Sequence, residues 1–318
     1  MKKNCIFIIP YFGKFNNYFQ LFLNSCSTNE NYNWLILTDD DGKYDYPKNV
    51  EVVNMKKSEL EEKIKEKFPT LSINLNKAYK LCDFRPAYGY IFSEYIKDYL
   101  FWGYCDNDMI FGNIDHFINI DEILKYDKIG VNGHFTLYRN SKENNELFMS
   151  NSRYKYVFES EKNCKFDEEF GKDFGDSINN IFVQNHKKIK YIKSMADIYV
   201  KSSNFKLTFY QEDKDCYYTE SKDKSIFVWD NGNLYKYKKI KNKIECNEYL
   251  YIHLQKRPMK VSLSNYSKYK IIPNSIENIE NNNYKTSFKG IKTKHLNLHY
   301  FIIRYKNLKQ KINNWRKS

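Results

Sequence analysis

The sequence predicts an α/β fold in which a mixed sheet is flanked by helices. Short apolar runs rich in β-branched and aromatic residues alternate with longer segments whose apolar residues recur at helical spacing. Several of the apolar runs end at proline, glycine or acidic residues, as the strands of a buried sheet do. Over 318 residues, an apolar fraction of 42% and an aromatic fraction of 18% supply a core for one large domain with an appendage.

The first seventy residues contain the clearest alternation of strands and helices. In chain order we expect a strand at 5–9, a helix at 15–26, strands at 34–37 and 50–55, and a charged helix at 57–68. Pro10 and Gly13 end the first strand, and the acidic stretch from Asp39 ends the second. This order of elements predicts parallel strand pairs.

The later elements are shorter and more polar. Pro86 is favoured at a first helical position, so a helix is expected from there to about residue 99. It is followed by a buried strand at 100–105, a strand-like segment at 129–138, a short strand near 190–192, hairpins over 204–240 and a last strand at 249–254. The polar run after residue 273 marks the expected boundary between a main domain, 1–273, and a linker with a basic helix, 274–318.

Cysteine usage and charge narrow the class of protein. The seven cysteines are scattered without a C-x-x-C pair, which predicts reduced thiols in a cytosolic protein rather than a disulfide framework or a zinc site. The apolar stretch that begins at Cys5 is too short for a signal peptide, and no run approaches the roughly 18 apolar residues of a membrane span. The net charge of +13 indicates an anionic partner, such as nucleic acid, acidic lipid or a phosphorylated substrate.

The strongest functional signal is the segment Asp106-Asn107-Asp108. The chain has three D-x-D segments, but only this one follows a long apolar strand and precedes a second apolar run. Carboxylates at the carboxyl end of a buried strand lie where open α/β sheets bind ligands. Their hard oxygen atoms suit Mg²⁺ or Mn²⁺ bridging a diphosphate. The alternative interpretation is a solvated turn that caps the strand.

A second signal lies about twenty residues upstream. Lys80, Asp83 and Arg85 cluster just before the expected helix, whose free N-terminal amide groups favour anions. The alternative is an ordinary salt bridge between Asp83 and either Lys80 or Arg85.

Together these two segments resemble the sugar-binding region of DXD-containing glycosyltransferases of the GT-A type. The likeness is strongest to the Golgi mannosyltransferases and the clostridial toxins, in which an Asp and an Arg ahead of the DXD contact the nucleotide sugar. A broader pattern resembles little-characterised bacterial proteins associated with surface-polysaccharide loci, and the likeness covers roughly residues 4–257. It includes the segments 8–13, 38–39, 82–84, 105–108 and 133–140.

The resemblance implies a Rossmann-like GT-A fold, a divalent cation held by Asp106 and Asp108, and a nucleotide-diphosphate sugar, a UDP-sugar, as donor. Asn107 is expected to lie against the same donor. Retention of the anomeric configuration is favoured. Two departures concern Arg85 most: Pro86 interrupts the helix that follows it, and the Gly-Gly-x-Tyr lead-in to the DXD is absent.

Further residues take their expected roles from the same resemblance. His253 resembles a late histidine that completes the metal shell, and Lys256, three positions on, would contact the diphosphate; a structural histidine is the alternative. Asp39 resembles the position that recognises the base or ribose, although a solvated turn explains it equally well. Pro10 and Tyr11 would line the same pocket, and His134 either faces the donor sugar or belongs to the core.

The residue that acts on the acceptor hydroxyl is expected in the loop after the D-x-D segment. Four carboxylates lie between Phe166 and Gly175, and one of them could serve as a general base. Asp173 and Asp167 are the candidates, although a solvated run of charges accounts for most of this stretch.

The sequence therefore predicts a metal-dependent glycosyltransferase that acts on a glycan or lipid-linked glycan acceptor. A basic nucleic-acid-binding protein is the alternative, but no helix-turn-helix, zinc finger or aromatic RNA-binding motif is present, so no nucleic acid is expected. A metal-dependent phosphatase would need threonine where Ile110 stands. A non-catalytic glycan-binding protein would need no nucleotide pocket.

The last thirty residues form a basic amphipathic segment. From about Lys289 to Ser318, seven apolar residues recur at three- and four-residue intervals among many cations: Leu298, Phe301, Ile302, Tyr305, Leu308, Ile312 and Trp315. Such a helix suits an anionic membrane surface, so we expect a cytoplasmic protein that is peripheral on the inner face of the cell membrane. The alternative is that the stripe packs on the main domain or on a second subunit.

Overall fold

The computed structural model describes residues 3–168, 177–211, 214, 216–221, 224–279 and 281–315. The chain forms two compact units, each made of three separate segments. The first unit comprises Met1–Phe15, Asn29–Asn107 and Ile118–Lys193, and the second comprises Asn16–Thr28, Asp108–Phe117 and Ser194–Ser318. The chain therefore crosses from the first unit to the second inside the D-x-D segment, between Asn107 and Asp108.

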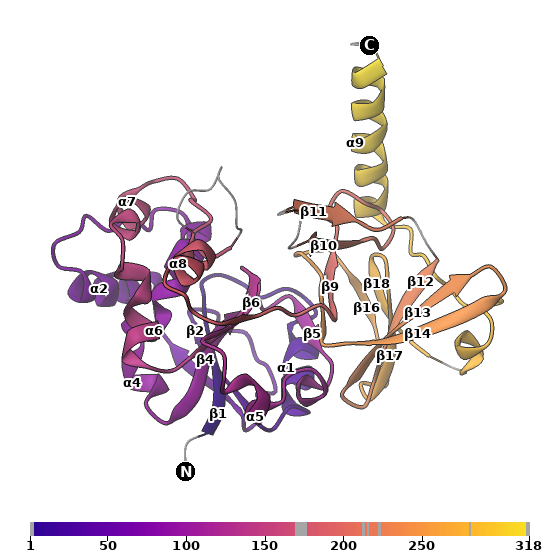
Figure 1. Ribbon diagram of the computed structural model, residues 1–318. Helices are drawn as coiled ribbons and strands as arrows, with labels where there is room; N and C mark the ends of the chain where they lie inside the picture. Colours follow the sequence, from indigo (N-terminus) through magenta and orange to yellow (C-terminus); the bar gives the residue numbers. More distant parts are fainter. Residues whose placement is uncertain are drawn as a thin grey trace. The chain divides into compact units, whose positions relative to one another are not determined.

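The first unit is built on a seven-stranded sheet of order β3-β2-β1-β4-β7-β6-β8 (Figure 1). Its strands are β1 Lys3–Tyr11, β2 Tyr32–Thr38, β3 Val50–Asn54, β4 Tyr99–Cys105, β6 Lys128–Asn132, β7 Phe135–Arg139 and β8 Ile189–Lys190. β1 pairs in parallel with both β2 and β4, and β2 pairs in parallel with β3. β7 is antiparallel to β4 and to β6, which makes the sheet mixed.

The helices of the first unit are short, and most of them contribute to one buried cluster on a face of this sheet. They are α2 Lys57–Lys67, the 3₁₀ helix η1 Ala78–Ala87, α3 Tyr88–Ile91, α4 Ser93–Ile96, α5 Ile120–Ile123, α6 Lys142–Glu146, η3 Leu147–Met149, α7 Arg153–Glu159 and α8 Ile178–Gln184. Ile6 and Ile8 of β1 belong to one buried cluster with Leu60 and Ile64 of α2. These positions alternate along the strand and recur at helical spacing along the helix, so each element contributes one apolar face to the core.

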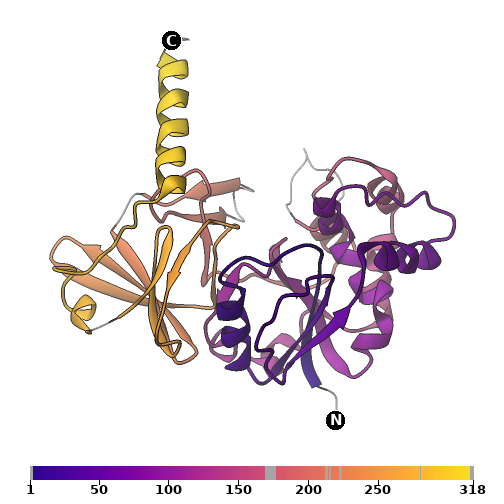
Figure 2. The ribbon, with the colours of Figure 1, turned by 180° about the vertical axis from the view of Figure 1, so that it is seen from behind.

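The second unit contains two sheets, which Figures 1 and 2 show from opposite sides. The five-stranded sheet has the order β11-β10-β9-β15-β5, with β5 Met109–Phe111, β9 Met195–Ile198, β10 Leu207–Gln211, β11 Cys216–Thr219 and β15 Tyr251–His253. The six-stranded sheet has the order β14-β13-β12-β17-β18-β16, with β12 Ser225–Asp230, β13 Asn233–Ile240, β14 Lys243–Tyr249, β16 Lys260–Ser262, β17 Lys268–Ile272 and β18 Ser275–Asn278. The helices of this unit are α1 Phe19–Ser27, η2 Ile114–His116, η6 Asn283–Lys285 and α9 Leu298–Trp315.

The structure confirms the coarse prediction of a mixed α/β protein and the strands expected at 5–9, 34–37, 50–55 and 100–105. The expected helix from Pro86 to residue 99 is wrong, because η1 ends at Ala87 with Pro86 inside it and is followed by two single-turn helices. The helical turns are interrupted at Phe92, whose φ of −108° and ψ of 32° lie outside the α-helical region.

Two of the expected strands also differ from those in the structure. The segment 129–138 is a hairpin, β6 and β7, rather than one strand; its pairing is irregular between Ile129 and Asn132, where Gly130 has a φ of +82°. The strand near residue 250 is not the last one, because β16, β17 and β18 follow it. β17 and β18 pair with each other across the boundary expected after residue 273, so both segments belong to one sheet. These late strands are short and polar, and their pattern is too weak to read from sequence.

Among the described residues, no helix is both long and apolar enough to cross a membrane.

Candidate functional site

The carboxyl ends of three neighbouring parallel strands carry residues that the sequence singled out. β1 ends at Tyr11, β2 at Thr38 just before Asp39, and β4 at Cys105 just before Asp106. Because β1 is parallel to both β2 and β4, these ends share one edge of the sheet. This is the edge at which open α/β sheets bind ligands.

The loop after β1 is fixed by the acidic turn after β2. Oδ1 of Asp39 accepts a hydrogen bond from the backbone N–H of Gly13 at 2.7 Å, and Oδ2 of Asp40 accepts one from that of Phe15 at 2.6 Å. Burial alone would raise the pKa of Asp40, but the N–H groups of Phe15 and Gly42 and the ammonium of Lys14 together lower it. The carboxylate of Asp40 is therefore suited to remain ionised, and the two side chains together hold this loop in place.

An aromatic group lies in the same loops. The Tyr11 ring stacks on Phe15 with centroids 4.9 Å apart and an interplanar angle of 16°, and Tyr44 meets Phe15 edge-on at 5.8 Å. The Tyr11 hydroxyl donates to the carbonyl of Lys14 at 3.1 Å, which fixes the ring. Pro10, one position earlier in β1, is half-buried. The arrangement places the half-buried ring of Tyr11 in the same pair of loops as the exposed carboxylate of Asp39.

Lys80 and Asp83 form a buried ion pair. Nζ of Lys80 lies 2.8 Å from Oδ2 of Asp83 and also donates to the carbonyls of Val157 and Lys162, at 2.5 and 2.7 Å. The Asp83 carboxylate accepts two further hydrogen bonds, from the backbone N–H groups of Cys164 at 2.8 Å and Phe166 at 3.0 Å. Lys80 and Asp83 therefore form the salt bridge that the sequence analysis gave as the alternative to donor binding. The hydrogen bonds to Cys164 and Phe166 also fix the segment that leads to Asp167.

Arg85 joins three parts of the first unit. Its guanidinium donates to Asp106, to the carbonyl of Gly133 and, at 2.9 Å, to Oδ2 of Asp167. It also lies over the ring of Tyr104, 5.4 Å from the centroid. The backbone N–H of Asp106 donates to the carbonyl of His134 at 3.0 Å, so Asp106 is held through both its side chain and its main chain.

Asp167 is almost completely buried, and its environment raises its pKa to about 6. Burial is the main cause, and the charge of Asp83 adds to it, whereas Arg85 opposes both. The Asp167 carboxylate accepts a hydrogen bond from Arg85, whose guanidinium also donates to Asp106. Asp173, the other candidate for the residue that acts on the acceptor hydroxyl, lies outside the described residues.

In the second unit, three polar side chains meet where β9, β15 and the start of β5 come together. The register pairs His253 with Asp197 in parallel and with Met109 in antiparallel alignment, which places Asp108 at the head of the neighbouring strand. Nδ1 of His253 lies 2.8 Å from Oδ1 of Asp197, and Nε2 lies 3.2 Å from Oδ1 of Asp108. His253 was expected at the end of a strand, and β15 does end there.

The turn after β15 closes over the same residues. Gln255 and Lys256 both adopt a left-handed backbone, with φ of +54° and +51°, which is uncommon for consecutive residues other than glycine. The N–H of Lys256 donates to Oδ2 of Asp108, and the amide of Gln255 donates to Asp197 at 2.6 Å. The Lys256 side chain is exposed, and the turn is anchored by the buried Arg257, which donates to Asn274 and Ser202.

Two buried polar atoms of the D-x-D segment have no hydrogen-bond partner among the described residues. One is Oδ1 of Asp108, whose contact with His253 lacks hydrogen-bond geometry, and the other is Nδ2 of Asn107. Asp108 and Asn107 are 1% and 5% exposed, respectively. Burying such groups unpaired costs about 1–3 kcal/mol each, so both atoms are suited to a ligand that supplies a cation and an acceptor.

One family comparison gives a match over most of the chain. The model of a family of unknown function, DUF6625, matches residues 7–280. The chain belongs to this family. A search of curated proteins found no match. The range matched by DUF6625 contains every site residue named above, from Pro10 to Arg257, and ends before α9.

Sequence reasoning missed Asp197 and Gln255. Asp197 lies in a four-residue strand with the sequence MADI, and only its pairing with β15 brings it to His253. The signal that could have identified Asp197 from the sequence is its position as an acidic residue inside a short apolar segment.

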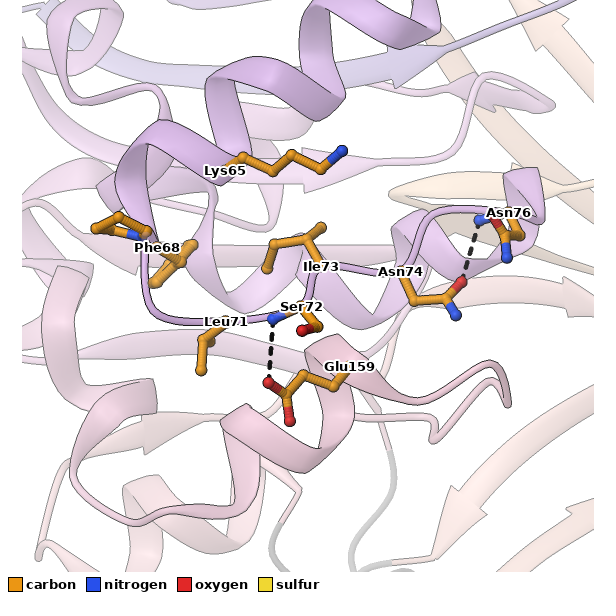
Figure 3. Close-up of a pocket in the computed structure, with 9 residues that line it drawn as sticks. Lys65, Phe68, Leu71, Ser72, Ile73, Asn74, Asn76 and Glu159 are labelled. Carbon is orange, nitrogen blue, oxygen red and sulfur yellow. Dashed lines mark hydrogen bonds between the residues drawn. The ribbon is translucent and has the colours of Figure 1, made fainter.

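A pocket of about 500 Å³ lies elsewhere in the DUF6625 match, beside the end of α2 (Figure 3). Phe68, Leu71 and Ile73 line it, and Glu159 accepts a hydrogen bond from the N–H of Ser72 at 3.1 Å. Figure 3 shows this carboxylate turned to the backbone of the loop. The carboxylate of Glu159 is therefore used to hold the loop after α2. None of the residues that line this pocket was a candidate site residue in the sequence analysis.

Proposed function

We propose that this protein is a metal-dependent glycosyltransferase of the GT-A type. It would transfer a sugar from a nucleoside diphosphate sugar, a UDP-sugar, to a glycan acceptor. The observation that carries the proposal is the buried Oδ1 of Asp108, which faces Nε2 of His253 and has no donor among the residues described.

The surroundings of His253 favour a cation at this position. When Nδ1 of His253 carries the proton and donates it to Asp197, Nε2 has a lone pair, and that lone pair faces a carboxylate oxygen. Two such acceptors repel each other unless a cation lies between them. Two ligands of one octahedral ion, each about 2.1 Å from it, lie about 3.0 Å apart, close to the observed 3.2 Å. The alternative is an imidazolium that pairs with both carboxylates.

Asp108 and His253 would hold the ion. Asp106 is proposed as a further ligand because of the D-x-D pattern, in which it lies two residues before Asp108. When bound, a divalent cation neutralises the charge that develops on a leaving diphosphate. Carboxylate oxygens with one imidazole suit Mn²⁺, and Mg²⁺ is the alternative.

Further residues are proposed to bind and orient the donor. Nδ2 of Asn107 is a buried donor suited to a diphosphate oxygen, and the exposed Lys256 adds a positive charge beside Asp108. Arg85 acts as a positioning residue, because its guanidinium is already bound to Asp106, Asp167 and Gly133. Lys80 and Asp83 support the segment leading to Asp167, and His134 acts through its carbonyl on Asp106.

The nucleoside would lie on the edge of the first unit where β1 and β2 end. The half-buried ring of Tyr11, stacked on the buried ring of Phe15, is suited to stack on a base, a contact worth about 1–3 kcal/mol in other proteins. The exposed carboxylate of Asp39, fixed by Gly13, is suited to accept hydrogen bonds from a ribose or a base. This position after β1 and β2 agrees with the GT-A resemblance, in which the nucleotide lies after the first two strands.

The test is a screen of nucleotide sugars for Mn²⁺-dependent hydrolysis without an acceptor. We expect the wild type to release the nucleoside diphosphate from one of the sugars and to stop when EDTA is added. The Asp108→Asn variant should show no Mn²⁺-dependent hydrolysis. Asp115→Asn is the matched control, since Asp115 is an exposed carboxylate of the same segment. Hydrolysis that persists in excess EDTA, or that Asp108→Asn retains, would refute the proposal.

A further inference from the structure

The helix α9 has an apolar face that no described part of the chain covers. Seven large apolar residues are exposed along it: Leu298, Phe301, Ile302, Tyr305, Leu308, Ile312 and Trp315. Trp315 is 78% and Leu298 76% exposed, and Phe301 is 56% exposed. At 100° per residue these seven side chains fall within one stripe along the helix. Figures 1 and 2 show α9 as one continuous helix from both sides.

The opposite face attaches α9 to the second unit. Tyr300 is the buried residue of the helix, and its N–H is capped by the side chain of Asn297 at 2.9 Å. One and two turns further on, Ile303 and Asn307 continue this face; both are partly buried, and Asn307 donates to the carbonyl of Lys201 at 2.8 Å. The helix is therefore held by its other side, and the stripe is exposed in the described part of the second unit.

Positive charge surrounds the stripe. Ten lysines and arginines and no acidic residue follow Glu280. Arg304 and Lys311 flank one edge of the stripe, Lys306 lies beyond the other, and Lys309 lies within it; all four are exposed. An apolar stripe bordered by cations, with an aromatic residue at its end, is the pattern of a helix that lies in the plane of a membrane.

We propose that α9 binds an anionic lipid surface, with its apolar stripe in the boundary between headgroups and acyl chains and its cations among the phosphates. The uniformly positive charge favours an anionic lipid surface over a protein groove of mixed charge. The wide exposed apolar stripe favours lipid over nucleic acid, which has no apolar layer to cover it. The proposal is independent of the glycosyl transfer proposed above, since α9 lies outside the matched family range.

The test is flotation of the full-length protein with vesicles. Wild type should float with vesicles of phosphatidylcholine and phosphatidylglycerol, float at least tenfold less with phosphatidylcholine alone, and be released by high salt. Phe301→Ser with Leu308→Ser should abolish flotation while circular dichroism shows the sheets retained. Gln310→Ser with Asn314→Ser is the matched control on the opposite face of α9 and should float like the wild type.

Three results would overturn the proposal. Equal flotation of the stripe variant and the wild type would show that the stripe is not used. Sedimentation that shows a wild-type dimer and a monomeric stripe variant, with no flotation of either, would assign the stripe to a second copy of the chain. Binding to RNA that competes away the vesicles and survives the stripe substitutions would assign the cations to nucleic acid.

Discussion

Asp83 and Asp108 are two buried carboxylates with opposite surroundings. Asp83 accepts hydrogen bonds from Nζ of Lys80 and from the N–H groups of Cys164 and Phe166, so both of its oxygens are occupied. Asp108 accepts one hydrogen bond, from the N–H of Lys256, on one oxygen, and its other oxygen has no donor within the described part of the chain. Both side chains are almost fully excluded from solvent.

The difference separates a carboxylate that holds the protein together from one that is suited to bind something else. The sequence signals around both residues were similar, since each is an aspartate near a buried element. What distinguishes them is the number of donors that the fold brings to each oxygen. Substitutions at the two positions should therefore affect different measurable quantities.

The largest expected effect on stability is at Asp83. Asp83→Ala leaves the ammonium of Lys80 buried without its counter-charge, which costs about 3–5 kcal/mol in the free energy of unfolding. Urea denaturation followed by circular dichroism measures this change. As a control, Lys80→Met combined with Asp83→Leu removes both charges and should recover a large part of the loss. A loss below about 1 kcal/mol for Asp83→Ala would contradict a structural ion pair.

The next effect depends on pH and concerns Asp167. Its pKa is about 6 in the folded protein, against about 3.9 for an unfolded aspartate. Between these values the folded state retains a proton that the unfolded state releases, so this group lowers the free energy of unfolding as pH rises from about 4 to 6.

Asp167→Asn removes that dependence and keeps an acceptor for Arg85. The stability of the variant relative to wild type should therefore rise across this window, by roughly 3 kcal/mol at most, since one pKa unit is worth about 1.4 kcal/mol. Chemical denaturation at pH 4 and at pH 7 measures the difference. A variant whose stability relative to wild type stays constant or falls over this range would show that the pKa of Asp167 is not raised.

A smaller effect is expected at Asp197, which orients His253 without touching the proposed ion. Asp197→Asn should weaken Mn²⁺ binding about 10–100-fold, the range for partners of metal-ligating histidines. The readout is the dissociation constant from calorimetry, with Asp230→Asn as a control, because Asp230 pairs with Lys268 in the other sheet of the unit. Unchanged affinity would mean that Asp197 serves only the fold.

Much of the first unit could be predicted from sequence because its strands are continuous apolar runs. β1, β2 and β4 were expected close to their observed bounds, and so was the position of Asp106 just after a buried strand. The apolar stripe of α9 was also read correctly as an amphipathic helix, since helical spacing is a local property.

The polar partners could not be predicted, because they depend on pairing between distant segments. Asp197 and His253 are 56 positions apart and meet through the parallel register of β9 and β15. The ion pair of Lys80 and Asp83 is an exception, because it was one of the two interpretations of that segment; η1 is a 3₁₀ helix, which aligns residues three positions apart. A D-x-D pattern likewise does not reveal which of its oxygens the fold leaves without a donor.

The most direct test of this account is a calorimetric titration of Mn²⁺ into wild type, Asp108→Asn and Asp115→Asn. Asparagine keeps an acceptor for the N–H of Lys256, so the fold of the Asp108 variant should survive, which its unfolding curve checks. We predict saturable Mn²⁺ binding by wild type and Asp115→Asn, and at least a hundredfold weaker binding by Asp108→Asn. Equal Mn²⁺ affinity in all three proteins would contradict the assignment of Asp108 as a metal ligand.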